Sequence, residues 1–293
     1  MPSLKEVKSR ITSVISTQQI TKAMKMVAAA KLRKSQDRIT QMRPYAQKLT
    51  GLFQNLSAAG QDEQAWYSVQ RPVEKVLLVV ISSDRGLCGS FNSTVIKAVA
   101  KLAAEKYQEQ TAKGNVTILP LGKKAFEFFS KRGYKMDSSF WNIFQGLSYE
   151  GVARVGEFLM EEFKAGRYDK IEIVYNEFKN VATQILRTEQ FLPVVPVAKE
   201  TTQRAEVDYI YMPNQEEIVT GLVPKALKIQ LYKAVLDSNA AENGARMTAM
   251  DKATDNAGEL LKDLKLTYNR TRQAAITKEI LEIVAGAEAL KAS

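Results

Sequence analysis

The chain has 293 residues, of which 45% are hydrophobic and 25% charged, and it carries a net charge of +10, a balance typical of an ordinary globular protein with one or two domains. A single cysteine and the complete lack of histidine exclude an intrachain disulfide, a multi-cysteine metal site and any hydrolytic mechanism that depends on a histidine base. The longest strongly apolar run has six residues against the roughly 20 that a membrane helix needs, and the N-terminus lacks the apolar core of a secretory signal, so we expect a cytosolic protein.

The first predicted element is a long N-terminal helix. From Leu4 to Leu56, apolar residues recur at alternating spacings of three and four, the pattern of a coiled-coil helix with a polar and small-residue centre. Such a helix would be about 80 Å long at about 1.5 Å per residue, which is too long for one small domain to bury. It therefore needs a partner helix. Pro44 lacks an N–H donor and predicts a kink or a break near Arg43.

A surplus of positive charge is concentrated on this helix. Residues 1–48 contain eleven basic and two acidic residues, so the rest of the chain is almost neutral. Such a one-sided charge predicts an acidic partner, either nucleic acid or an acidic protein surface. The densest part, here named the basic stripe, consists of Lys22, Lys25, Lys31, Arg33 and Lys34.

The middle of the chain alternates strands and helices. We predict strands over residues 76–82, 116–121, 170–175 and 183–191, and helices over residues 94–108, 123–131 and 152–164. This alternation predicts a mostly parallel, Rossmann-like sheet with right-handed crossovers.

The segment Ser83 to Ser90 follows the first predicted strand, where α/β proteins place binding loops. It matches neither the dinucleotide-binding nor the phosphate-loop glycine pattern, and Cys88 has no histidine to activate it. We therefore favour a structural turn or a partner contact over an enzymatic site.

The last predicted element is a second long helix. Apolar residues keep the three-four spacing from Met247 to Tyr268, and the stripe then shifts by one residue and continues from Ile276 to Leu290. The sequence thus predicts an α/β protein in which N- and C-terminal helices form a long antiparallel coiled coil, with a Rossmann-like α/β domain inserted between them. The expected boundaries are 1–60 for the N-terminal shaft helix, 72–208 for the inserted domain and 215–293 for the C-terminal shaft helix.

Four stretches together resemble one known family. Residues 20–33 (ITKAMKMVAAAKLR), 82–92 (SSDRGLCGSFN), 244–257 (GARMTAMDKATDNA) and 266–290 are similar, in order and spacing, to the γ subunit of F-type ATP synthases of the bacterial type. Ser90 and Gly244 are small departures from the family pattern.

The resemblance implies a rotary central stalk that couples ion flow through a membrane sector to ATP synthesis or hydrolysis in a ring of α and β subunits. It implies no catalytic site, cofactor or metal in this chain, with ε and the c-ring as further partners and a peripheral position at the cytoplasmic face of the cell membrane. Contacts with the α/β ring are expected at Met24, Lys25, Arg246, Gln273 and Thr277. Acidic loops of the ring are expected to meet Lys22, Lys31, Arg33 and Lys34. Contacts of the base are expected at Tyr209 and Tyr211.

Two other functions remain open at this stage. A coiled-coil protein that binds nucleic acid would also explain the basic stripe, although the stripe lacks the interleaved aromatic residues of a single-strand binding surface. An α/β enzyme would rest on the loop from Ser83 to Ser90 alone, without convergent catalytic groups.

Overall fold

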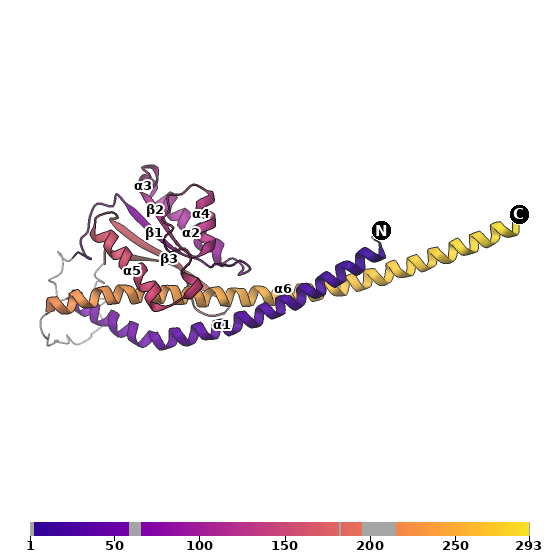
Figure 1. Cartoon of the computed structure of the whole chain (residues 1–293), viewed down its shortest axis with the longest axis horizontal. Helices are drawn as coiled ribbons and strands as arrows, with labels where there is room; N and C mark the ends of the chain where they lie inside the picture. Colours follow the sequence, from indigo (N-terminus) through magenta and orange to yellow (C-terminus); the bar gives the residue numbers. More distant parts are fainter. Residues whose placement is uncertain (1–2, 59–65, 182, 195–214, 293) are drawn as a thin grey trace. The chain divides into compact units, whose positions relative to one another are not determined.

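The structure, a computed structural model, describes residues 3–58, 66–181, 183–194 and 215–292 (Figure 1). The chain forms two compact units, one made of Met1–Ala28 with Met247–Ser293 and the other of Ala29–Arg246. Two long helices contribute to both units, and the α/β part lies wholly in the second one. The predicted boundaries at 60 and 208 fall outside the described residues, and the three-part division of the chain stays a prediction.

The long helices are α1, Leu4–Ala58, and α6, Gln215–Ala292. The break predicted near Arg43 does not occur, because α1 continues without interruption through Pro44. A proline removes only one N–H donor, and α1 buries Ile39 before Pro44 and Leu49 after it. Packing on both sides of the proline therefore keeps the two halves of the helix in one element.

The two helices run antiparallel in each unit. In the first unit Thr21 contacts Thr254 and Lys25 contacts Asp251, so the partner's number falls as the number in α1 rises. In the second unit the side chain of Ser35 donates to Asn239 at 2.7 Å, beside a small apolar cluster. The cluster consists of Leu32, Ile39, Leu236 and Ala240. The predicted antiparallel coiled coil is confirmed.

The sheet has four strands in the order β2-β1-β3-β4. The strands are β1, Val76–Ile81, β2, Val116–Leu121, β3, Lys170–Phe178, and β4, Gln184–Leu192. β1 pairs in parallel with both β2 and β3, whereas β4 pairs antiparallel with β3. The predicted mostly parallel sheet is therefore confirmed, with one antiparallel strand at its edge.

Both faces of the sheet are covered, which explains why β1 is apolar throughout. Leu77, Val79 and Ile81 pack on the side of α5, Tyr149–Lys164, and the part of α6 that belongs to this unit. The alternate residues of β1 pack on α2, Phe91–Lys101, and α4, Lys123–Lys131. Figure 1 shows the helices on the two sides of the sheet. The smaller elements are the π-helix η1, Leu102–Lys106, α3, Gln108–Ala112, and the 3-10 helix η2, Ile143–Gly146.

The helix predicted over residues 94–108 is correct in type but not in its limits. It begins at Phe91, changes to the π-helix at Leu102 and is followed by the short α3. Tyr107, at the junction, has a φ of −117° and a side chain that is 3% exposed. Burial of this aromatic ring against the sheet overrides the regular helical repeat, which is information that a local pattern does not contain.

The turn from β2 into α4 requires a glycine. Gly122 has a φ of +119°, and a Cβ atom there would lie 2.2 Å from the main-chain oxygen of Ser82. The hydroxyl of Ser82 accepts a hydrogen bond from the N–H of Ala125 at 2.9 Å. The first and second βα turns are thereby packed directly against each other.

Candidate functional site

The basic stripe is exposed on α1. Lys22, Lys31, Arg33 and Lys34 are all exposed, and no ion pair involves them among the described residues. Lys22 lies in the first unit, near exposed apolar side chains of the same helix: Ile20, Met26 and Val27 are 60%, 61% and 56% exposed. Lys31, Arg33 and Lys34 lie in the second unit.

Met24 and Lys25 have different surroundings from the rest of the stripe. Met24 is half-buried, whereas Met26 is exposed. The Lys25 ammonium is 2.5 Å from a carboxylate oxygen of Asp251 on α6, and both side chains are partly exposed. The charge of Lys25 is thus matched within its own unit. Asp251 was not singled out from the sequence, because its partner lies 226 residues away.

Gln273 and Thr277 lie on the exposed part of α6. Both are exposed, and the hydroxyl of Thr277 donates to the main-chain oxygen of Gln273 at 2.9 Å. Exposed apolar side chains follow on the same stretch of helix: Ile276, Ile280, Leu281, Ile283 and Val284.

Arg246 is held inside its own unit. Its guanidinium donates to the Glu242 carboxylate at 2.6 Å and to the main-chain oxygens of Arg85 and Gly86 at 3.0 and 3.3 Å. The side chains of Arg246 and Glu242 are each 12% exposed. Burial raises the pKa of Glu242, and the neighbouring Arg246 lowers it in part. Arg246 therefore fastens the loop after β1 to α6.

The same loop is held by further internal contacts. Ser83 donates its hydroxyl to the main-chain oxygen of Arg85 at 2.6 Å, and Asn92 accepts from the N–H of Ser83 at 3.0 Å. Cys88 is buried in an apolar cluster with Phe91 and Ala241, and burial raises the pKa of its thiol. The surroundings of Cys88 thus favour the neutral thiol over the reactive thiolate.

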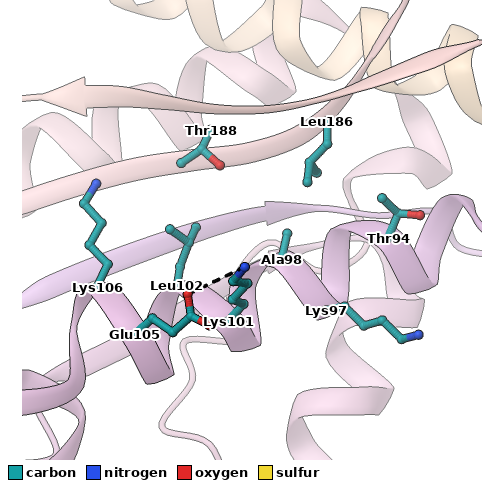
Figure 2. Close-up of a pocket in the computed structure, with 9 residues that line it drawn as sticks. All are labelled: Thr94, Lys97, Ala98, Lys101, Leu102, Glu105, Lys106, Leu186 and Thr188. Atoms are coloured by element: carbon teal, nitrogen blue, oxygen red, sulfur yellow. Dashed lines mark ion pairs between the residues drawn. The ribbon is translucent and has the colours of Figure 1, made fainter.

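A groove lies between α2, η1 and β4. Its volume is about 360 Å³. Figure 2 shows Lys106 extending from η1 toward the sheet, whereas Lys97 points away from it. Lys101 pairs with Glu105 at 3.7 Å, and Lys106 pairs with the buried Glu172 on β3 at 2.5 Å. Two of the three lysines are therefore already neutralised, and the lining has no group of converging catalytic side chains. The lining residues are Thr94, Lys97, Ala98, Lys101, Leu102, Glu105, Lys106, Leu186 and Thr188.

Comparison with known sequences identifies the family. The sequence model of the family described as ATP synthase matches residues 3–290. The "ATP synthase gamma chain" of Cytophaga hutchinsonii is 55% identical over 293 residues, which cover 99% of both chains. That of Flavobacterium johnsoniae is 57% identical over 291 residues and 99% of both chains, and that of Chlorobaculum tepidum is 48% identical over 292 residues. The chain belongs to the ATP synthase gamma chain family.

Solved structures agree with this assignment. A chain of the Tetrahymena thermophila mitochondrial ATP synthase, from its central stalk and c-ring, is 27% identical and covers 80% of this chain and 99% of its own, with a TM-score of 0.63. A chain from the rotor of the Euglena gracilis mitochondrial ATP synthase is 21% identical, covers 93% of this chain and 98% of its own, and has a TM-score of 0.67. The latter likeness concerns the fold, which is that of the predicted class.

Membership of the gamma chain family confirms the resemblance, and the individual contact residues stay predictions. Tyr209 and Tyr211, predicted for the base, lie outside the described residues. None of the helices in the described ranges is long and apolar enough to cross a membrane. Within the same ranges, no three acidic, cysteine or histidine side chains gather as a metal site would require.

Proposed function

We propose that this chain is the rotary central-stalk subunit of an ATP synthase and couples ion flow through a membrane sector to ATP synthesis or hydrolysis in an α/β ring. The observation that carries the proposal is its full-length match to gamma chains, together with two long antiparallel helices at opposite ends of the chain. In this proposal the chemistry occurs in the ring, and the chain contributes no catalytic residue and binds no cofactor. Nothing in the family assignment favours the nucleic-acid alternative.

We further propose that the basic stripe and its apolar neighbours face the ring. Exposed lysines beside Ile20, Met26 and Val27 suit acidic loops that also carry apolar side chains, because charge complementarity and apolar burial then act together. Lys25 is a weaker candidate than the other cations, since Asp251 already neutralises it. We also propose that Met24, Gln273 and Thr277 contact the ring. Arg246 would reach the ring only if its guanidinium left Glu242 and the main-chain oxygens of Arg85 and Gly86.

The base of the stalk is proposed to meet ε and the c-ring, with Tyr209 and Tyr211 among its contacts. A c-ring is named together with the central stalk in the Tetrahymena structure, which supports this part of the proposal. We also propose a peripheral position at the cytoplasmic face of the cell membrane, where a stalk would stand on the membrane sector without crossing it.

Charge reversal of the exposed stripe tests the proposal. The variant carries four substitutions: Lys22→Glu, Lys31→Glu, Arg33→Glu and Lys34→Glu. We expect ATP-driven ion pumping in inverted membrane vesicles to fall at least about tenfold, which corresponds to about 1.4 kcal/mol at the interface. Co-purification with α and β subunits distinguishes loss of assembly from loss of coupling.

The matched control carries the same change of charge on exposed lysines of the α/β part. Its substitutions are Lys75→Glu, Lys97→Glu, Lys113→Glu and Lys131→Glu. Pumping should stay near the wild-type rate in the control, because none of these four residues belongs to the long helices. Equal pumping by the stripe variant and the wild type would refute the proposed contact. Failure of the wild-type chain to co-purify with α and β subunits would refute the stalk function itself.

A further inference from the structure

A polar cluster interrupts the apolar contact between α1 and α6 in the unit formed by Met1–Ala28 and Met247–Ser293. The hydroxyls of Thr21 and Thr254 are 2.8 Å apart, and the Thr21 side chain is buried. One turn away, the Lys25 ammonium meets the carboxylate of Asp251 at 2.5 Å. Gln18 completes the cluster, which we name the polar key, with its amide 3.5 Å from the main-chain oxygen of Thr254.

Either hydroxyl of the polar key can donate to the other. The Thr254 hydroxyl also lies 2.7 Å from the main-chain oxygen of Met250, which is its alternative acceptor within α6. Thr21 also lies 3.0 Å from the main-chain oxygen of Gln18, which is its alternative acceptor within α1. The interhelix hydrogen bond therefore depends on the alignment of the two helices, whereas each hydroxyl keeps an acceptor in any alignment.

Gly258 makes room for the third member of the polar key. A Cβ atom at Gly258 would lie 3.2 Å from the side-chain nitrogen of Gln18, closer than an ordinary contact. The absence of a side chain thus allows Gln18 to lie across α6 at this level. One turn along the helix, at Leu261 or Thr254, a side chain would stand in its path.

The apolar contacts beside the polar key have little directional preference. Val7, Ala28, Ala257 and Leu261 are buried in this unit, and Met250 is buried next to Asp251. Burial of such side chains is non-directional, so a slip of one turn would exchange one apolar contact for another. A hydrogen bond and an ion pair, in contrast, are lost when their partners move by about 5.4 Å.

We propose that the polar key sets the axial register of α1 against α6. A single polar position in a coiled coil is known to select register at some cost in stability, and the polar key has the same physical basis in an antiparallel pair. Its members are positioning residues, and the inference does not depend on the proposed function. Ser35 and Asn239 join the same helices in the other unit, so removing the polarity of the polar key should leave the helices paired and populate a second register only within the unit of Met1–Ala28 and Met247–Ser293.

Pulsed electron paramagnetic resonance on the full chain tests this inference. Spin labels are placed at Ser16 and Arg272, both exposed, in a Cys88→Ala background that leaves no other cysteine. Since Thr21 lies opposite Thr254, Arg272 is about 20 Å further along α6 than the level of Ser16. This offset makes the label-to-label distance sensitive to a slip along the axis.

The apolar variant combines Thr21→Val, Lys25→Met, Asp251→Leu and Thr254→Val. The chain with the wild-type polar key should give one label-to-label distance. The apolar variant should show a second distance that corresponds to a slip of about one turn, with a population comparable to that of the first. Circular dichroism checks that the helices persist in this variant. If they do not, the same distance measurement is made on the milder double variant Thr21→Val with Thr254→Val. A single unchanged distance in the apolar variant would overturn the proposal.

Charge exchange provides the matched control. Lys25→Glu alone places two acidic side chains opposite each other and should broaden the distance distribution. Lys25→Glu with Asp251→Lys restores an ion pair at the same level, so it should restore the single distance. A second register in the exchanged variant would show that the ion pair has no part in setting the register, which would contradict the inference.

Discussion

Replacement of Arg246 by alanine removes the charge partner of a buried carboxylate. Glu242 and Arg246 are each 12% exposed, and the same guanidinium holds the main-chain oxygens of Arg85 and Gly86. Breaking a buried ion pair by removing one partner costs about 3–5 kcal/mol, because the remaining charge is left uncompensated. Since the pair keeps slight exposure, we expect the free energy of unfolding to fall by about 3 kcal/mol at pH 7.

The free energy of unfolding that Arg246→Ala loses should depend on pH, and the surroundings of Glu242 determine the direction of this dependence. Burial raises the pKa of Glu242 and Asp84 adds to this, whereas Arg246 and, more weakly, Lys31 lower it. An acid whose pKa is higher in the folded than in the unfolded chain binds more protons when folded, so stability falls as the pH rises from the unfolded pKa to the folded pKa. Without Arg246 the folded pKa of Glu242 is higher still, so this fall in stability continues to higher pH. The destabilisation should therefore be larger at pH 7 than at pH 5, because the folded variant binds a proton at Glu242 more readily as the pH falls.

Urea unfolding of the full chain at both pH values measures this effect, with Glu242→Gln combined with Arg246→Ala as the control. The control has no carboxylate to leave unpaired, so it should be more stable than Arg246→Ala alone and should lack the extra pH dependence. Cys88 provides a local readout, since loosening of the loop should make this buried thiol react about tenfold faster, the equivalent of about 1.4 kcal/mol. A loss below about 0.5 kcal/mol at pH 7, or the same loss at both pH values, would refute the reasoning.

Three further changes test other contacts. Gly122→Ala should lower the free energy of unfolding by more than about 3 kcal/mol in a urea titration. The φ of +119° at this position is strained for other residues, and the new Cβ would lie 2.2 Å from the main-chain oxygen of Ser82. A loss below about 1 kcal/mol would contradict this prediction. Lys106→Met should cost about 2 kcal/mol, because the buried Glu172 then keeps only the more distant Lys170, at 3.8 Å, among its ion-pair partners in the described residues. Adding Glu172→Gln should recover part of the loss, and no recovery would show that the ion pair is not the cause. Met24→Lys should reduce pumping more than ATP hydrolysis in the same membranes. It should also lower stability more than Met26→Lys does, because Met24 is half-buried and Met26 is exposed. Equal thermal midpoints for the two variants would argue against this difference in stability.

The sequence alone was sufficient for the elements that depend on local pattern. The three-four spacing predicted both long helices, and the buried run at Val76 predicted the central strand. These predictions succeeded because the apolar period of an element is written in consecutive residues. The length of the first helix also indicated that it needs a partner, and the second apolar stripe indicated which segment provides one.

The same local logic failed where packing overrides a residue's intrinsic preference. Pro44 predicted a kink or a break near Arg43, and the break does not occur, because apolar residues on both sides of Pro44 are buried and α1 continues through it. The helix predicted over residues 94–108 changes to a π-helix at Leu102, since burial of Tyr107 fixes the chain at that point. Both outcomes depend on neighbours that are distant in the sequence.

The polar contacts were decided only by the tertiary structure. The spacing of four between Glu242 and Arg246 permits an ion pair on one helix face, but nothing local indicated that the pair would be buried or that the guanidinium would hold Arg85 and Gly86. The pair of Lys25 with Asp251 joins residues 226 positions apart. Apolar periodicity reports which face of a helix is buried, whereas hydrogen bonds and ion pairs require two particular atoms to meet, and only the packed chain determines which atoms do so.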